Sequence, residues 1–144
     1  MDNLIPEDNL IPGILEKSVL IVDSDEESRL AITDHLSAKG ITVSHAETCE
    51  MALALLEGQS FDLILTGILI PEMGGIELAR RIKEYMPEQA VIIVTSCDDV
   101  KNSIEAMRLH VNDYILKPVD LDELETRITN GIILSQVTKA KPDK

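Results

Sequence analysis

The sequence predicts a doubly wound α/β fold, in which helices cover both faces of a parallel five-stranded sheet. Short apolar runs alternate along the chain with segments of helical periodicity. Three of these runs lack the polar alternation of strands that face water on one side. Right-handed crossovers between parallel strands then place helices on both faces. With 144 residues, 44% of them hydrophobic, the chain can form one domain around a single core.

The strands are expected at short runs of β-branched and aliphatic residues. Residues 19–22, 63–66 and 91–95 are almost wholly apolar, which is typical of strands buried on both faces. Residues 41–44 alternate between apolar and polar side chains and predict a strand nearer an edge. Residues 114–116 complete the set.

Helical patterns fill the intervals between these strands. The patterns Ser96-x-x-Asp99 and Asp120-x-x-Glu123 are typical of helix starts. Glycine closes two other helical segments, at Gly40 and Gly58. Apolar residues share one helical face within residues 51–56, 100–107 and 121–132.

The two ends of the chain are expected to lie outside the α/β domain, which we predict over residues 18–134. Residues 1–17 form an N-terminal arm in which the motif Asp-Asn-Leu-Ile-Pro occurs twice, and its prolines oppose regular structure. A loosely docked arm and a partner-binding peptide both stay open for it. Residues 135–144 are expected to be a mildly basic, disordered tail.

Composition narrows the classes of partner. A formal net charge of −13 repels nucleic acids and anionic lipids, so we expect a protein partner and neither direct nucleic-acid nor membrane binding. No apolar run approaches the ~20 residues that cross a bilayer, and no signal sequence is recognisable, which indicates a cytoplasmic protein. Cys49 and Cys97 form no CxxC motif. His35, His45 and His110 show no metal-ligand spacing, so surface or cap roles are expected.

The working site of such a sheet is expected beyond the carboxyl ends of its central strands. No glycine-rich phosphate loop follows the first strand, so nucleotide and flavin cofactors are not predicted. The residues that follow the strands are acidic, hydroxylic or cationic apart from one glycine. They are Asp23, Ser24, Asp25, Gly67, Thr95, Ser96 and Lys117.

Over roughly residues 18–132 the chain resembles the receiver domain of bacterial response regulators, the CheY-like family. Five landmarks carry the resemblance, in the order and spacing of the family: Asp23 after the first strand, the segment 61–75, Thr95, Tyr114, and the pair Lys117-Pro118. The resemblance implies a flavodoxin-like strand order of 2-1-3-4-5. It also implies a role in two-component phosphorelay signal transduction, and no enzymatic activity.

The chain departs from this family at two of three acids. A receiver accepts a phosphoryl group on an aspartate at the end of the third strand, where Mg²⁺ neutralises the charge. Asp23 matches the first acid of the family, but Ser24 stands at the second and Gly67 at the phosphoacceptor. Glycine supplies neither a nucleophile nor a metal ligand.

The resemblance therefore implies a vestigial pocket with no catalytic residue and no bound metal or cofactor. Asp23 then pairs with Lys117, or Lys117 is solvated; both alternatives stay open. The pocket is expected to consist of Asp23, Ser24, Gly67, Thr95 and Lys117, and its vestigial metal positions are Asp23, Ser24 and Leu69.

The resemblance also implies that Thr95 and Tyr114 are switch residues, and that partners dock on the fourth helix, fifth strand and fifth helix. The partner is a histidine kinase, an output protein or a second copy of the chain, so a homodimer is among the options. The partner face is expected to include Val100, Ile104, Met107, Tyr114, Leu121 and Glu125.

We thus predict a receiver-like module that acts by phosphorylation-independent protein–protein interaction. Three alternatives stay open. The first is a functional phosphoacceptor receiver. The second is the receiver fragment of a larger transcription regulator, because residues 120–124 resemble the corresponding stretch in the receivers of such regulators. A small redox or nucleotide-binding protein of the same topology is the alternative from another class.

Overall fold

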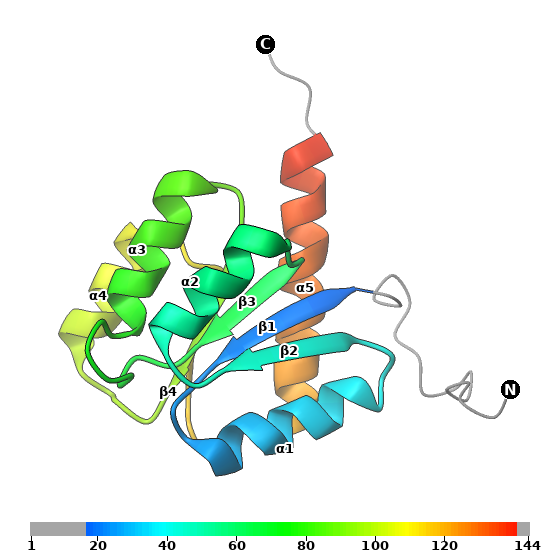
Figure 1. Ribbon diagram of the computed structural model, residues 1–144, viewed down its shortest axis with the longest axis horizontal. Helices are drawn as coiled ribbons and strands as arrows, with labels where there is room; N and C mark the ends of the chain where they lie inside the picture. The colour runs from blue at the N-terminus through cyan, green and yellow to red at the C-terminus, as the bar shows by residue number, and fades with distance from the viewer. Residues whose placement is uncertain (1–16, 141–144) are drawn as a thin grey trace, which may run out of the picture.

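The computed structural model describes residues 17–140, with side chains up to residue 137. The predicted N-terminal arm therefore lies outside the described residues, apart from Lys17. Strands and helices alternate along the whole described chain (Figure 1). The elements are β1 (Ser18–Val22), α1 (Glu26–Ser37), β2 (Thr42–Ala46), α2 (Cys49–Gly58), β3 (Leu63–Thr66), α3 (Gly75–Tyr85), β4 (Ala90–Thr95), α4 (Val100–Arg108), β5 (Asp113–Leu116) and α5 (Leu121–Ala140).

The sheet has the order β2-β1-β3-β4-β5, and all neighbouring strands are parallel. This confirms the predicted fold and strand order. Every residue of β3 and β4 is buried, whereas β2 and β5 are partly exposed at the two edges. The apolar runs without alternation are therefore the inner strands, as predicted.

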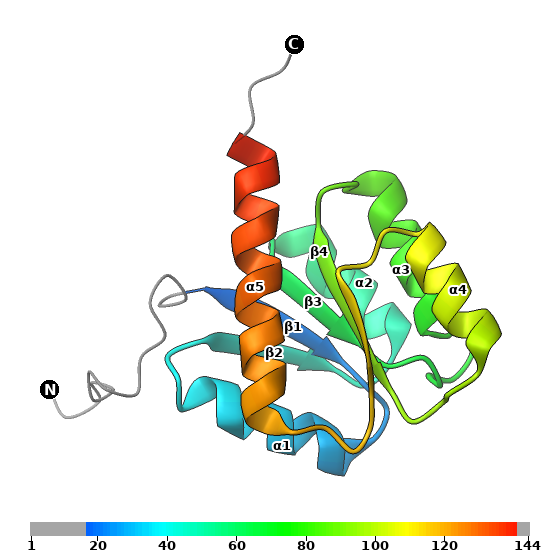
Figure 2. The same ribbon diagram turned by 180° about the vertical axis from the view of Figure 1, so that it is seen from behind.

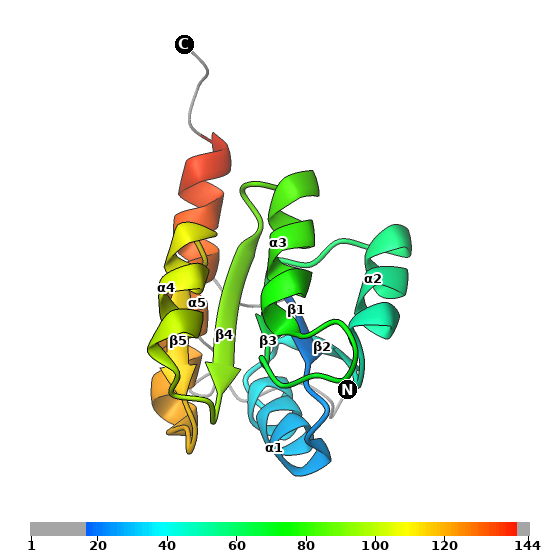
Figure 3. The ribbon, with the colours of Figure 1, turned by 90° about the vertical axis from the view of Figure 1, so that its left-hand side faces the viewer.

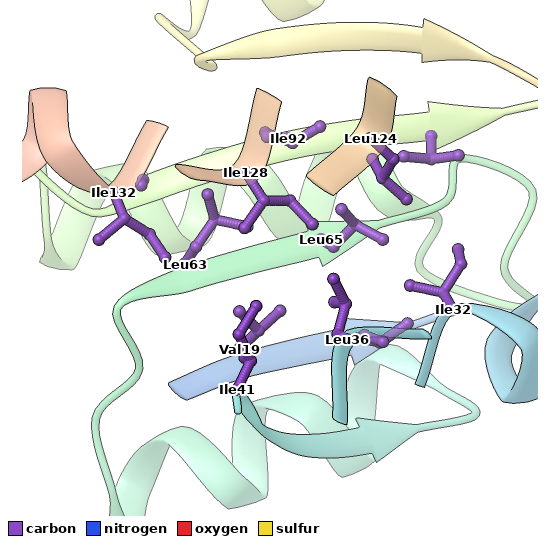
Figure 4. Packing of buried hydrophobic residues seen from close by; sticks show 13 residues of the cluster. Val19, Ile32, Leu36, Ile41, Leu63, Leu65, Ile92, Leu124, Ile128 and Ile132 are labelled. Atoms are coloured by element: carbon purple, nitrogen blue, oxygen red, sulfur yellow. The ribbon is translucent and has the colours of Figure 1, made fainter. Parts of the chain in front are cut away.

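Helices cover both faces of the sheet. The buried clusters place α1 and α5 on one face and α2, α3 and α4 on the other. Figure 2 shows α5 in front of the sheet, and Figure 3 shows α2 and α3 on the opposite side of β4 from α5. On the α1 and α5 face, Leu124, Ile128 and Ile132 of α5 are buried with Ile32 and Leu36 of α1 (Figure 4). The predicted apolar face of the last helix is thus the one that packs on the sheet.

Two side chains fix the starts of α4 and α5. The Asp99 carboxylate accepts a hydrogen bond from the Lys101 N–H at 2.9 Å, so Asp99, and not Ser96, caps α4. The Asp120 carboxylate accepts hydrogen bonds from the N–H groups of Asp122 and Glu123, at 2.9 and 3.1 Å. The predicted helix start at Asp120 is confirmed.

Helix α5 continues to Ala140, past residue 134, where we expected the tail to begin. Ser135 explains the continuation, because its side chain is buried and its hydroxyl donates to the Glu88 carbonyl oxygen at 2.9 Å. The expectation of a disordered end is therefore wrong for residues 135–140. Within the described chain, no helix combines the length and apolarity that crossing a membrane would demand.

The loop between β3 and α3 folds back onto the end of β3. The Gly75 N–H donates to the Ile68 carbonyl oxygen at 2.9 Å. A Cβ atom on Gly75 would lie 1.6 Å from the Gly67 carbonyl oxygen, far inside van der Waals contact. Only glycine permits this approach, so Gly75 fixes how the loop closes over the sheet edge.

We expect Gly75→Ala to lower the free energy of unfolding by about 3 kcal/mol, because the loop must move to relieve the clash. Gly58→Ala is the matched control: a Cβ atom there has nothing within 4 Å. The control should change stability by less than about 0.5 kcal/mol. Urea denaturation of the three proteins measures the difference, and equal stability of the two variants would contradict the close approach.

Candidate functional site

A cavity of about 160 Å³ opens beyond the carboxyl ends of the inner strands. It is lined by the whole predicted pocket together with Leu69: Asp23, Ser24, Gly67, Leu69, Thr95 and Lys117. A larger cavity of about 430 Å³ lies at the opposite end of the sheet, around Ser18 and Asp62. The smaller cavity is the candidate site, because the charged and hydroxyl groups converge there and parallel α/β sheets bind ligands at this end.

An ion pair occupies the centre of the site. The Lys117 ammonium lies 2.9 Å from Asp23 Oδ2 and 3.7 Å from Asp25 Oδ2. The other carboxylate oxygen, Asp23 Oδ1, accepts the Asp25 N–H at 3.0 Å. Both oxygens of Asp23 are therefore engaged, and of the two open alternatives for Lys117 the ion pair is confirmed.

Backbone contacts hold both partners of this pair. The Asp23 N–H donates to the Ala46 carbonyl oxygen at 3.1 Å, and the Lys117 N–H donates to the Thr95 carbonyl oxygen at 2.8 Å. The buried Arg29 guanidinium donates to the Asp23 carbonyl oxygen at 2.8 Å. Sequence reasoning missed Arg29, although an arginine one helical turn into the helix after Asp23 was the available signal.

Gly67 is the corner of the site that lacks a side chain. Its N–H donates to the Val22 carbonyl oxygen at 2.9 Å, which places it at the end of β3 beside β1. A Cβ atom on Gly67 would lie 3.5 Å from Asp23 Oδ1 and 3.6 Å from the Val94 carbonyl oxygen. These are ordinary contacts, so the space at Gly67 admits a side chain next to the Asp23 carboxylate.

The Ser24 hydroxyl bonds within the site. It donates to the Leu69 carbonyl oxygen at 3.2 Å. Ser24 and Leu69, two of the three predicted vestigial metal positions, are therefore hydrogen-bonded directly to each other. A hydroxyl donor at this point satisfies an oxygen that would otherwise be a candidate cation ligand.

The two predicted switch residues meet at the backbone of one residue. Thr95 is 3% exposed, and its hydroxyl oxygen accepts the Cys97 N–H at 3.0 Å. The Tyr114 hydroxyl donates to the Cys97 carbonyl oxygen at 3.1 Å. Sequence reasoning could not find this contact, because the Cys97 groups involved belong to the backbone and carry no residue-type signal.

The environment of Tyr114 keeps its hydroxyl protonated. Its ring packs with Ile68, Ile93 and Ala106. Burial raises the pKa of the Tyr114 phenol above its ordinary value, and negative charge on nearby Cys97, Asp99 and Asp98 raises it further. The phenol therefore remains a hydrogen-bond donor to Cys97 over the whole neutral range.

The predicted partner face is only partly exposed as one surface. Val100, Ile104 and Met107 of α4 are 67%, 44% and 73% exposed, and Leu116, on the fifth strand of the predicted face, adds a fourth exposed apolar side chain. We call these four residues the α4–β5 surface.

The two α5 residues of the predicted partner face, Leu121 and Glu125, do not belong to this surface. Leu121 packs against the core cluster between the sheet, α1 and α5. Glu125 lies against α1, with its carboxylate 2.8 Å from His35 Nε2 and its side chain only 17% exposed. Their inclusion in the partner face is corrected, because the helix turns both side chains towards α1.

Comparisons with known proteins agree on one family. Residues 19–129 match the response regulator receiver domain. A cyclic di-GMP phosphodiesterase of Thermotoga maritima is 35% identical over 115 residues, which are 80% of this chain and 31% of that protein. The regulatory protein AtoC of Escherichia coli is 30% identical over 121 residues, which are 84% of this chain and 26% of that protein. The chain thus spans about a quarter to a third of the length of these curated relatives.

Solved structures agree in fold. The crystal structure of a CheY-like response regulator receiver domain protein from Methanospirillum hungatei JF-1 superposes with a TM-score of 0.82 at 29% identity. The superposition covers 85% of this chain and 98% of that chain.

In a Tyr85→Phe background, which leaves Tyr114 as the only tyrosine, we expect the phenol to ionise at higher pH in the folded than in the unfolded protein. Folding favours the neutral phenol. The contribution of the neutral Tyr114 phenol to folding stability is therefore fully present below its ordinary pKa of 10.0. This contribution is lost as the pH rises through the raised pKa of the folded protein. The ultraviolet absorbance of ionised phenol measures this, with the chain in denaturant as reference. Coincident titrations would contradict the burial of the Tyr114 phenol in the folded protein.

Proposed function

The chain belongs to the response regulator receiver domain family, and we propose that it signals by binding a protein partner without accepting a phosphoryl group. One observation carries the proposal: the end of β3 presents Gly67 to the site, and the neighbouring carboxylate of Asp23 is already paired with Lys117. The pocket thereby retains the cation of a phosphate-binding site and lacks the nucleophile.

The other oxygen nucleophiles near β3 are poorly placed to replace an aspartate at Gly67. Asp62 lies at the opposite end of the strand, where its carboxylate accepts the Ser18 N–H at 2.8 Å. The Thr66 hydroxyl is fully buried and donates to the Gly67 carbonyl oxygen at 2.9 Å. Neither group can reach a phosphodonor in the cavity beside Lys117.

The side chains present also do not fit a magnesium ion. Mg²⁺ takes near-octahedral oxygen ligands, with carboxylates most prominent among the protein groups. Here Asp23 is neutralised by Lys117, the Ser24 hydroxyl faces the Leu69 carbonyl, and Gly67 offers no ligand. We infer that the pocket is held together by its own ion pair in place of a metal.

The switch residues support a fixed signalling state. Thr95 and Tyr114 both bond the Cys97 backbone, so hydrogen bonds already link the two switch residues through one residue. We infer that the chain presents one constant surface to its partner.

That surface is the α4–β5 surface. Three of its apolar side chains recur at helical spacing on α4, and the fourth lies on the edge strand β5. Exposed apolar side chains gathered on one helix face favour protein interaction. The partner is a histidine kinase, an output protein or a second copy of this chain.

A second candidate function is that of a receiver module within a larger transcription regulator. The match to the transcriptional regulatory protein ZraR of Escherichia coli covers 26% of that protein, which favours this reading. The two candidates share the site and the α4–β5 surface, and they differ in whether the partner is covalently attached.

We expect no phosphorylation when the protein is incubated with acetyl phosphate and Mg²⁺. The intact mass should stay unchanged, because no carboxylate stands at position 67. Added Mg²⁺ should also leave the thermal unfolding midpoint unchanged. Mass spectrometry and thermal melts make the test. An acid-labile phosphoryl group located between residues 62 and 72 would refute the proposal.

The Gly67→Asp, Ser24→Asp double variant is the positive control, since a Cβ atom at position 67 meets only ordinary contacts. Without metal it should be destabilised by about 1–3 kcal/mol, because added carboxylates crowd Asp23 and Asp25. Mg²⁺ should recover part of this loss by binding only the folded state. A folded double variant that ignores Mg²⁺ would show that more than these two residues separates the site from a metal-binding receiver.

We expect Met107→Glu to weaken partner binding by about 10- to 100-fold, because it places a charge at the most exposed apolar side chain of the α4–β5 surface. The matched control is Leu30→Glu, an exposed leucine on α1, which should bind as the wild type does. The free energy of unfolding of both variants should lie within about 0.5 kcal/mol of the wild-type value. Quantitative co-precipitation from the native cell extract, with sedimentation of the purified chain for self-association, compares them. Equal loss in both variants would exclude the α4–β5 surface.

A further inference from the structure

A histidine of α1 and two carboxylates of α5 meet at a second polar cluster. His35 Nε2 lies 2.8 Å from Glu125 Oε1 and 3.6 Å from Asp122 Oδ1. One ligand atom from each of the three side chains lies within 4.8 Å of the others. We propose that His35, Asp122 and Glu125 form a binding site for a divalent transition-metal ion such as Zn²⁺.

The separations suit such an ion. Ligand atoms 2.0–2.2 Å from a tetrahedral Zn²⁺ stand roughly 3.3–3.6 Å apart. The distance from His35 to Asp122 already has this value, and that from His35 to Glu125 is about half an ångström shorter. Asp122 is 86% exposed, so its carboxylate can rotate to complete the site. Three protein ligands leave the remaining coordination positions to water.

The charges around the cluster favour a cation. Two carboxylates face one imidazole, and among the ion pairs of the described chain no lysine or arginine reaches Asp122 or Glu125. The nearby Arg127 is engaged elsewhere, by Asp113 at 2.7 Å and Glu123 at 3.1 Å. A bound divalent ion would balance the negative charge that His35 alone leaves.

The two inner ligands are held in place before an ion arrives. The side chains of His35 and Glu125 are only 20% and 17% exposed. Asp122 and Glu125 are spaced i, i+3 at the start of α5, so they share one face of a helix whose first turn is capped by Asp120. Of the three ligands, only the exposed Asp122 therefore has to be ordered on binding.

The ligand set selects the type of metal. Imidazole nitrogen suits zinc, copper and nickel, whereas Mg²⁺ and Ca²⁺ prefer oxygen ligands alone. None of the three residues lines the cavity around Asp23 and Lys117. The site is thus separate from the receiver pocket in place and in ligand chemistry, and it does not depend on the proposed signalling function.

A bound ion would join α1 to α5. His35 lies in the last turn of α1, and Asp122 and Glu125 lie in the first two turns of α5. Figure 2 shows these two helices crossing on one face of the sheet. Because the three ligands come together only in the folded chain, the ion would stabilise it by mass action.

The test is titration of the full chain with zinc chloride, followed by the ring-nitrogen resonances of the histidines and by thermal unfolding. We expect zinc to shift the His35 resonances and raise the melting temperature. His35→Gln, which keeps a hydrogen-bonding group beside Glu125, should weaken zinc affinity at least about tenfold. His45→Gln and Cys97→Ser are controls for other donors and should bind zinc as the wild type does.

Several outcomes would overturn the proposal. One is unshifted His35 resonances at saturating zinc, and another is equal zinc affinity of the wild type and His35→Gln. Should His35→Gln fail to fold, the exposed Asp122→Asn makes the same comparison, with the same expected loss. Magnesium chloride at equal concentration should leave the His35 resonances in place; a response equal to that of zinc would contradict a site chosen by imidazole.

Discussion

The parallel register of the sheet is the constraint on which the site depends. Because β1, β3, β4 and β5 run in the same direction, their carboxyl ends meet at one edge, and the residues just beyond them converge. Asp23, Gly67, Thr95 and Lys117 come from four separate stretches of sequence, yet they line one cavity. The buried apolar runs that form the inner strands therefore also determine which polar groups can act together.

Charge neutralisation is the second constraint on the site, because its buried ammonium and carboxylate balance each other. A mostly buried ammonium is costly unless it is paired, and removing one partner of such a pair is strongly destabilising. Lys117 and Asp23 satisfy each other at 2.9 Å, and Asp25 adds a weaker contact at 3.7 Å. Two further sets of hydrogen bonds lie at this end of the sheet: Ser24 bonds Leu69, and Thr95 and Tyr114 bond the Cys97 backbone.

The sequence predicted those features that rest on periodicity or on residue type at a strand end. It predicted the inner strands, the buried face of α5 and the pocket residues. It did not predict that α5 passes residue 134, because the buried Ser135 is polar and its partner Glu88 lies 47 positions away in the chain. For the same reason it gave no hint that His35 meets Glu125, 90 positions later. Contacts between distant helices depend on packing and not on local pattern.

Two glycines near the site show how packing and chemistry separate. Gly75 is required by the backbone, because a Cβ atom there would overlap the Gly67 carbonyl oxygen. Gly67 is not required in this way, since its surroundings admit a Cβ atom at ordinary contact distances. The glycine at position 67 therefore needs a chemical explanation. A third carboxylate beside Asp23 and Asp25 would leave Lys117 as the single cation facing three negative charges, an arrangement that a metal ion can balance and that Lys117 alone cannot. A small neutral residue at position 67 avoids this repulsion.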